Sequence, residues 1–246
     1  MDERLERVEA EAFASLAESA GLPLHRVAGA VCTAAPIAPE NPLLNRVSGI
    51  ADADDDELAE IDAFFHEHGI AHYIVATASP QLAARLAARG FEQRLAWMKF
   101  RRDPTTPLAS GTSLRIGDAA GDDIAAIVGA VFGGPELGAM VAALPGRDGW
   151  NCFAAYEGDE PVACGALFVH DGAGWLGAAG TLPEHRGKGA QSSILAARIA
   201  RASELGVDVL ATETGARSND GPNTSYDNIL RAGFTEAYLR PNLLSP

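Results

Sequence analysis

The sequence predicts a mixed α/β (α+β) protein built from two related copies of one fold. Strand-like and helix-like hydrophobic patterns alternate along the 246 residues. A pattern of helix end, glycine and strand recurs in the two halves of the chain. Residues 104–112 are rich in Pro, Thr and Ser, which is typical of a linker. We therefore expect a first domain over residues 1–103 and a second over residues 113–246.

Two pairs of matching segments define the repeat. Glu67-His68-Gly69-Ile70 ends a helical stretch before the strand-like residues 71–77, and Glu204-Leu205-Gly206-Val207 does the same before residues 207–212. Further on, residues 86–92 match residues 230–236. The second copy is longer, and we place its insertion in the turn-rich segment 215–223, which holds Asn219-Asp220-Gly221-Pro222. Chance is the alternative, because many helices end in glycine.

The elements of the second half follow from periodicity and turn residues. Gly158-Asp159 between two alternating apolar runs predicts a hairpin. In the helix expected over residues 191–204, Leu195, Ile199 and Ala202 form an apolar stripe, with Arg198 and Arg201 outside it. In chain order we expect a strand at 113–116, helices at 118–132 and 135–144, strands at 151–157, 162–170 and 175–181, the helix at 191–204, a strand at 207–212 and a helix at 224–232.

Composition narrows the class of protein. The formal net charge of −14 argues against nucleic acid or an anionic membrane as a partner, because both need clustered Lys and Arg. The three cysteines are widely spaced and form no metal or disulfide pattern, so we expect free, buried thiols in a reducing compartment. Neither a signal peptide nor a membrane-spanning run is apparent, and we expect a cytoplasmic protein. His66, His68 and His72 do not have metal-ligand spacing, so no metal is expected.

Residues 181–193, TLPEHRGKGAQSS, carry the strongest functional signal. Gly187 and Gly189 lie between a predicted strand and a predicted helix. Glycines let the backbone approach a ligand closely, and the free N–H groups at a helix start bind anions. Arg186 and Lys188 add positive charge. The spacing fits neither a Walker phosphate loop nor a dinucleotide-binding fingerprint. An ordinary glycine-rich surface turn is the alternative.

This loop resembles motif A of the GNAT superfamily of N-acetyltransferases, Arg/Gln-x-x-Gly-x-Gly/Ala. Arg186, Gly189 and Gln191 take the defining positions, although Gln191 replaces the usual small residue. The resemblance covers about residues 112–241. It implies GNAT-like domains, each a mixed, mostly antiparallel twisted sheet flanked by helices, and acetyl-CoA as cofactor between two diverging strands. The cofactor-binding residues it implies are Gly180, Thr181, Leu182, Arg186, Gly187, Lys188, Gly189, Ala190, Gln191, Ser192, Asn223, Ser225 and Asn228.

The resemblance also implies a reaction. A small-molecule amine would attack the acetyl thioester directly in a ternary complex, with backbone N–H groups around Gly180–Leu182 stabilising the carbonyl oxygen. Many family members carry a Glu on the strand before the loop, but residues 175–180 have none. Glu213 is then the candidate base, or a structural strand-end carboxylate. Ile229 stands where relatives have a catalytic Tyr, so Tyr226, one helical turn earlier, is the candidate acid, or a core residue.

The first copy lacks the loop. Where the second copy has Arg186-Gly187-Lys188-Gly189, the first has Ala51-Asp52-Ala53-Asp54-Asp55-Asp56-Glu57. Carboxylates can cap a helix, but they repel a pyrophosphate. We therefore expect one acetyl-CoA site, in the second copy, and a degenerate first copy. The alternative function is a non-catalytic acyl-CoA-binding or regulatory module. The expected partner is a small-molecule amine, and the chain would be a monomer or a homodimer.

Overall fold

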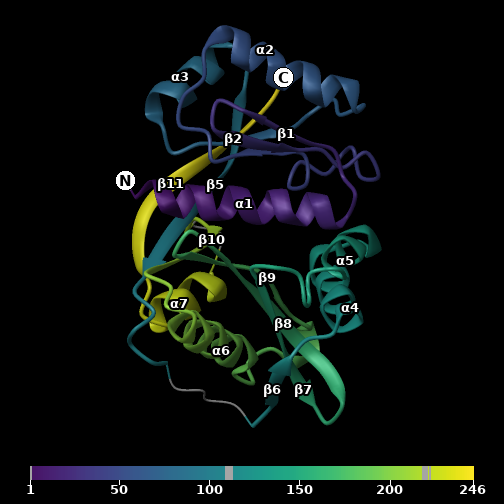
Figure 1. Ribbon diagram of the computed structural model, residues 1–246, viewed down its shortest axis with the longest axis vertical. Helices are drawn as coiled ribbons and strands as arrows, with labels where there is room; N and C mark the ends of the chain where they lie inside the picture. The colour runs from purple at the N-terminus through teal and green to yellow at the C-terminus, as the bar shows by residue number, and fades with distance from the viewer. Residues whose placement is uncertain (1, 109–112, 218–220, 222) are drawn as a thin grey trace. The chain divides into compact units, whose positions relative to one another are not determined.

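The computed structural model describes residues 2–108, 113–217, 221 and 223–246. Its helices and strands alternate along the chain (Figure 1) and group into two compact units. Unit 1 consists of Met1–Lys99, Glu213–Asn223 and Glu236–Pro246, and unit 2 of Phe100–Thr212 and Thr224–Thr235. Strand pairing is mixed and mostly antiparallel, which confirms the predicted fold class.

Unit 1 contains a sheet with the strand order β1-β2-β3-β4-β11-β5. The pair β3–β4 is parallel and is connected through α2. The last residues of β5, from Phe100 on, and the first residue of β11, Thr235, belong to unit 2. The elements are α1 (Glu3–Ser19), β1 (Leu24–Val27), β2 (Ala30–Thr33), β3 (Arg46–Ser48), α2 (Asp55–Glu67), β4 (Ile74–Ala76), α3 (Pro80–Ala88), β5 (Glu92–Arg102) and β11 (Thr235–Leu244).

Helices cover both faces of the unit 1 sheet. Successive residues of a strand point to opposite faces. On β2, Val31 packs with Ala10 and Ala14 of α1, whereas Cys32 belongs to the core formed with α2 and α3. Figure 1 shows α1 on one side of these strands and α2 and α3 on the other. Unit 1 therefore has two apolar layers.

Unit 2 contains each element expected over residues 113–232, with ends shifted by a few residues. Its strand order is β10-β9-β8-β7-β6, and β9–β10 is the parallel pair. The predicted turn at Gly158-Asp159 joins β7 to β8. The elements are β6 (Arg115–Asp118), α4 (Gly121–Phe132), α5 (Pro135–Val141), β7 (Trp150–Glu157), β8 (Glu160–His170), β9 (Ala173–Thr181), the 3-10 turn η1 (Pro183–His185), α6 (Ala190–Glu204), β10 (Val209–Gly215) and α7 (Thr224–Arg231).

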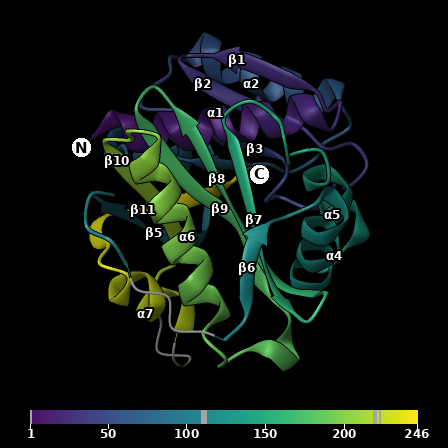
Figure 2. The same ribbon diagram turned by 60° about the horizontal axis from the view of Figure 1, so that its bottom comes forward.

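The faces of the unit 2 sheet are covered by different helices. A Cβ atom at Gly165 of β8 would meet Ile194 of α6, whereas one at Gly180 of β9 would meet Val131 of α4. Gly180 pairs with Cys164, the neighbour of Gly165, so the two glycines face opposite sides of the sheet. Figure 2 shows α6 lying across the strands and α4 with α5 beside them.

The helix ends that define the repeat have matching geometry. Gly69 and Gly206 have φ of 71° and 69°, the left-handed conformation that ends a helix. The following amides close equivalent bonds, Ile70 N to Phe65 O and Val207 N to Ala202 O, both at 3.0 Å. Each unit thus contains a parallel β-α-β crossover of the same kind. The common origin of the two units stays a prediction.

The two units do not follow the expected division of the chain. Glu213–Asn223 and Glu236–Pro246 belong to unit 1, although the sequence places both in the second copy. The reason lies in β11, which pairs antiparallel with β4 through Asn242–Ala76, Leu243–Val75 and Leu244–Ile74. Residues 109–112 of the expected linker and residues 218–220 and 222 of the expected insertion lie outside the described residues.

Two compositional expectations can be checked on the structure. Cys32, Cys152 and Cys164 are all free and buried, as expected. Across the part of the chain that the structure describes, no helix combines the length and apolar character needed to cross a bilayer.

Candidate functional site

The strand that leads into the loop carries a β-bulge. In the β8–β9 ladder, Ala166 pairs with Gly177 and Cys164 pairs with Gly180, so Ala178 and Ala179 together oppose Gly165. Ala178 has a φ of 45°, which is uncommon for a residue with a side chain. A bulge leaves its extra residue without a ladder partner and redirects the strand. No local sequence pattern predicts this bulge, because alanine has no preference for positive φ.

The glycine-rich loop places an uncapped helix start after the strand. Gly187 and Gly189 have φ of 76° and 81°, so both need the left-handed freedom of glycine. Gly189 is the N-cap of α6, and within the described residues no side-chain capping hydrogen bond is formed at this helix end. Ala190 is buried and Ser192 half-buried in the first turn. The first amides of α6 are thus available to an anion, with the positive end of the helix dipole behind them.

Two exposed cations flank these amides. Arg186 donates from Nε to the carbonyl of Thr181 at 3.3 Å, which holds its side chain against the end of β9. Lys188 Nζ lies 3.3 Å from Glu157, and His185 Nδ1 lies 2.9 Å from the same carboxylate. Leu182 donates its amide to Val162 O at 3.0 Å. The Leu182 N–H, one of the donors expected around Gly180–Leu182, therefore already has a hydrogen-bond acceptor within the chain.

The equivalent helix start in unit 1 carries a capping box. Asp54 accepts from the Glu57 amide at 2.9 Å, and Glu57 accepts from the Asp54 amide at 2.7 Å, forming a capping box. Arg85 lies 3.0 Å from Asp52, and Arg89 lies 2.7 Å from Asp55. The Asp54 and Glu57 amides and the two arginines at this helix start therefore have partners within the chain. That the first copy holds no pyrophosphate stays a prediction.

Three predicted cofactor residues lie together beside the start of α6. Asn228 of α7 donates a hydrogen bond to the side-chain carbonyl of Gln191, and Gln191 donates to Ser225 Oγ at 3.5 Å. Gln191 thus ties the first turn of α6 to α7. Its departure from the small residue of the motif has a structural role here. Asn223 belongs to unit 1, and its side-chain amide donates to Gly215 O at 2.8 Å.

The two predicted catalytic residues lie in different units, and the side chains of both are largely buried. Tyr226 of unit 2 is 3% exposed and packs edge-to-face on Phe100, with the two ring centroids 4.8 Å apart. Glu213 of unit 1 lies 3.0 Å from Lys99. Burial raises the pKa of Glu213, the nearby Glu9 carboxylate raises it further, and Lys99 opposes the shift. These contacts also account for each residue in its alternative, structural role.

Arg198 corrects one prediction from the sequence. It was expected outside the apolar stripe of its helix, yet it is 2% exposed. Its guanidinium donates to Ala166 O at 3.2 Å and to Gly177 O at 3.5 Å, next to the bulge. The stripe itself is confirmed, because Leu195, Ile199 and Ala202 are all buried. A glycine at position 165 makes room for Arg198, and helical periodicity alone does not reveal it.

The parallel ladder between β9 and β10 is short. Its pairs are Ala173–Val209, Gly174–Leu210 and Trp175–Ala211, and Thr212 Oγ1 then donates to Leu176 O at 2.9 Å. Beyond this point β9 continues to Thr181 paired with β8. The bulge therefore lies in the part of β9 that follows the paired residues of β10.

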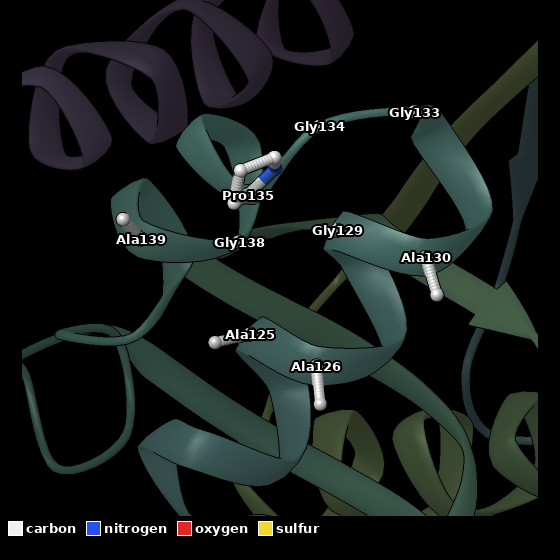
Figure 3. A pocket seen from close by; sticks show the side chains of 9 residues that line it. All are labelled: Ala125, Ala126, Gly129, Ala130, Gly133, Gly134, Pro135, Gly138 and Ala139. Atoms are coloured by element: carbon white, nitrogen blue, oxygen red, sulfur yellow. The ribbon is translucent and has the colours of Figure 1, made fainter.

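A hollow of about 560 Å³ lies along α4 and α5 (Figure 3). Its lining has only Ala, Gly and Pro, none of which has a side chain that can bind or activate a polar substrate. We assign no chemistry to it. The lining residues are Ala125, Ala126, Gly129, Ala130, Gly133, Gly134, Pro135, Gly138 and Ala139.

Comparison with known proteins supports the resemblance. The model of the Acetyltransferase (GNAT) family matches residues 130–221, which include the bulge and the loop. A GCN5-related N-acetyltransferase from Kribbella flavida superposes with a TM-score of 0.65 at 16% identity, covering 96% of this chain and 95% of its own. A GCN5-related N-acetyltransferase from Sphaerobacter thermophilus gives a TM-score of 0.60 at 14% identity, and the superposition covers 100% of this chain and 93% of that protein.

A tandem GNAT protein from the clavulanic acid biosynthesis pathway, solved without AcCoA, gives a TM-score of 0.55 at 15% identity, covering 77% of this chain and 68% of its own. No curated protein matches the sequence. At these identities the likeness shows the fold alone. The chain therefore has a GNAT-like fold over nearly its whole length, and residues 130–221 match the family model.

Proposed function

We propose that this chain is an acetyltransferase that moves the acetyl group of acetyl-CoA to the amine of a small molecule. The observation that carries the proposal is the uncapped start of α6 behind two left-handed glycines, Gly187 and Gly189, with Arg186 and Lys188 exposed beside it. When bound, acetyl-CoA supplies an acetyl group activated as a thioester. The matched family segment, residues 130–221, supports acetyl transfer as the reaction class.

Each part of the loop has a role in binding. The first amides of α6, with Ser192 in its first turn, would hold the pyrophosphate, and the cations would neutralise it. Gln191, Ser225 and Asn228 form a polar cluster at the same helix start, where an amide-rich pantetheine arm can exchange hydrogen bonds with them. For Asn223, whose amide already bonds Gly215 O, we propose a supporting role in shaping the chain before α7.

The bulge on β9 would orient the thioester. Because the Leu182 amide is engaged with Val162, we assign the acetyl carbonyl to the backbone N–H groups at Ala178 and Ala179. Donors fixed before the reaction stabilise the charge that develops on the oxygen as the amine attacks. We retain Glu213 as the proposed base and Tyr226 as the proposed acid. Neither carries the proposal, since their burial and contacts equally fit structural roles.

The proposal is tested by CoA titration calorimetry and by thiol release from acetyl-CoA across a panel of small amines. We expect CoA binding, and turnover with at least one amine. Reversing both charges, Arg186→Glu with Lys188→Glu, should weaken CoA binding by about 10- to 100-fold, because two attractive contacts to phosphate become repulsive. The matched control is Arg94→Glu on the exposed part of β5, which should leave the affinity unchanged.

Three outcomes separate the alternatives. An unchanged CoA affinity in the double variant would show that the loop is not the phosphate site. Tight CoA binding without turnover on any amine would favour the non-catalytic acyl-CoA-binding module. Absence of CoA binding by the wild-type chain would overturn the whole proposal.

A further inference from the structure

Arg198 is a buried cation that contacts no carboxylate in the part of the chain that the structure describes. The side chain comes from the middle of α6 and is 2% exposed. Its three hydrogen bonds go to backbone carbonyls, those of Ile194 at 3.3 Å, Ala166 at 3.2 Å and Gly177 at 3.5 Å. Burial lowers the pKa of Arg198 to about 10, which still leaves it charged at neutral pH. Burying a charge without a counter-ion is costly, so a compensating use for it is expected.

The acceptors of Arg198 define that use. Ala166 and Gly177 are the ladder pair on one side of the bulge, and one nitrogen, Nη1, contacts both of their carbonyls. The guanidinium also lies against Gly165, the one residue opposite the bulge, since a Cβ there would come within 3.0 Å of Cζ. Because the same Cβ would lie 2.7 Å from Ile194 Cγ2, any larger residue at position 165 would require these neighbouring side chains to shift.

The orientation of the bulge follows from these contacts. A guanidinium that draws two carbonyls toward α6 fixes the peptide planes next to the bulge. In β9 the following residue, Ala178, takes the φ of 45° that creates the bulge. Strained backbone persists only where its surroundings hold it in place. Among the described side chains, Arg198 is the charged group that bonds to the strands at this point.

We propose that Arg198 is a positioning residue, which holds the β9 bulge in the shape that presents the Ala178 and Ala179 amides to the acetyl carbonyl. This proposal rests on the proposed acetyl transfer. Arg198 does not touch the substrate. It acts through the backbone of β8 and β9, from the same helix whose first turn binds the phosphates, and so links the two halves of the cofactor site through one rigid element.

The test compares Arg198→Met, Arg198→Lys and the control Arg201→Met, which lies one turn further along α6 and bonds Asn151 at 2.9 Å instead of the bulge. Amide hydrogen exchange over residues 176–182, CoA affinity, kcat and KM are measured for each. In Arg198→Met we expect exchange in this segment to rise about tenfold and kcat to fall about tenfold or more, the effect of losing charge-assisted hydrogen bonds. CoA affinity should change less than about twofold, because the uncapped helix start is untouched.

Arg198→Lys keeps the charge and should restore part of kcat, whereas Arg201→Met should match the wild type. Unchanged exchange and kcat in folded Arg198→Met would overturn the proposal, as would an equal loss in Arg201→Met. If Arg198→Met does not fold, Arg198→Gln, which is neutral and can still donate, decides by the same readouts. Should the wild-type chain lack acetyl transfer, the proposed function fails, while the exchange data still report whether Arg198 holds the bulge.

Discussion

At the scale of single residues, unit 1 is organised by a buried network of charges. Glu9 of α1 is 0% exposed and contacts Arg46, Lys99 and Arg240. Carboxylates and cations balance within the network, which also includes Glu6 and Glu213. Buried ion pairs add little stability compared with apolar packing, but breaking one is costly because a charge is left without compensation. The network therefore ties α1 to β3, β5 and β11.

Glu9 makes this network sensitive to acid. Burial alone would raise the pKa of Glu9, but the charges of Arg240, Lys99 and Arg46 outweigh it and lower the pKa far below its ordinary value of 4.5. The unfolded chain thus takes up a proton as the pH falls through about 4.5, while the folded chain does not. The stabilisation from Glu9 is complete above this pH. It is lost progressively as the pH falls toward the folded pKa.

Glu9→Gln should lower the free energy of unfolding at pH 7 by about 3–5 kcal/mol, because the cations around it lose their counter-charge. The variant should also lose less stability than the wild type between pH 5 and pH 3. Urea unfolding at a series of pH values measures both effects. Glu3→Gln, exposed on the same helix, is the control and should cost less than about 1 kcal/mol. Equal pH slopes for Glu9→Gln and the wild type would contradict the role of Glu9.

Single residues also show where prediction from sequence ends. The loop residues Arg186, Gly187 and Gly189 could be predicted, because their geometry depends on neighbours in the chain. Arg198 could not, since its partners in β8 and β9 are distant in sequence. Ala178 at the bulge has no residue preference that would reveal its conformation. The position of Arg198 and the conformation of Ala178 depend on contacts between residues far apart in the sequence, which is why they could not be predicted.

At the scale of elements, the starts of α2 and α6 differ in their capping, although both helices belong to the same kind of crossover. In α2 the capping box of Asp54 and Glu57 uses the free amides. In α6 the N-cap is Gly189, which has no side chain to offer. Capping depends on residues within a few positions, so this difference was predictable from sequence. The start of α2 is stabilised by its own side chains, whereas the start of α6 has no capping side chain at its N-cap residue.

The pair α4 and α5 depends on close backbone contact. A Cβ atom at Gly138 of α5 would lie 2.4 Å from Ala125 O, and one at Gly121 of α4 would lie 2.3 Å from Ala142 O. Figure 3 shows how closely the backbone near Gly138 approaches the turn of α4 that carries Ala125. Neither neighbouring atom belongs to a flexible side chain, so the helices would have to move apart.

We expect Gly138→Ala to lower the free energy of unfolding by about 1–3 kcal/mol, the usual cost of overpacking, despite the better helix propensity of alanine. Gly134→Ala is a matched control. Its added Cβ would meet only the end of the Glu136 side chain, at 2.7 Å, which can rotate away. Thermal or urea unfolding of both variants measures the difference. A Gly138→Ala chain as stable as Gly134→Ala would show that the helices separate easily.

At the scale of the whole molecule, the order of segments along the chain differs from their grouping in the fold. Nearly all of β11 belongs to unit 1, with Leu243 in the core around α2 and α3 and Arg240 in the charge network. We did not expect a strand at Thr235–Leu244, because its pairing with β4 joins residues far apart in sequence. Local patterns predicted the elements of residues 113–232, but not β1, β2, β3 and β5 of unit 1. The long-range pairing that assigns the C-terminal strand to unit 1 had no local signature.

This grouping predicts that residues 1–103 do not fold alone, although the sequence suggested a domain with that boundary. The fragment would lack the partner of β4 in β11, the Leu243 contact in the core, and Arg240 beside Glu9 and Glu6. Without Arg240, Glu6 loses its cation and Glu9 keeps only Arg46 and Lys99. Breaking a buried ion pair costs about 3–5 kcal/mol, which is a large part of the roughly 5–15 kcal/mol that stabilises a typical domain. We expect the fragment to lack near-UV circular dichroism and a cooperative urea transition, and residues 104–246 supplied in trans to restore part of both. A fragment that unfolds alone in one sharp transition would show instead that unit 1 is complete at residue 103 and that β11 only adds to it.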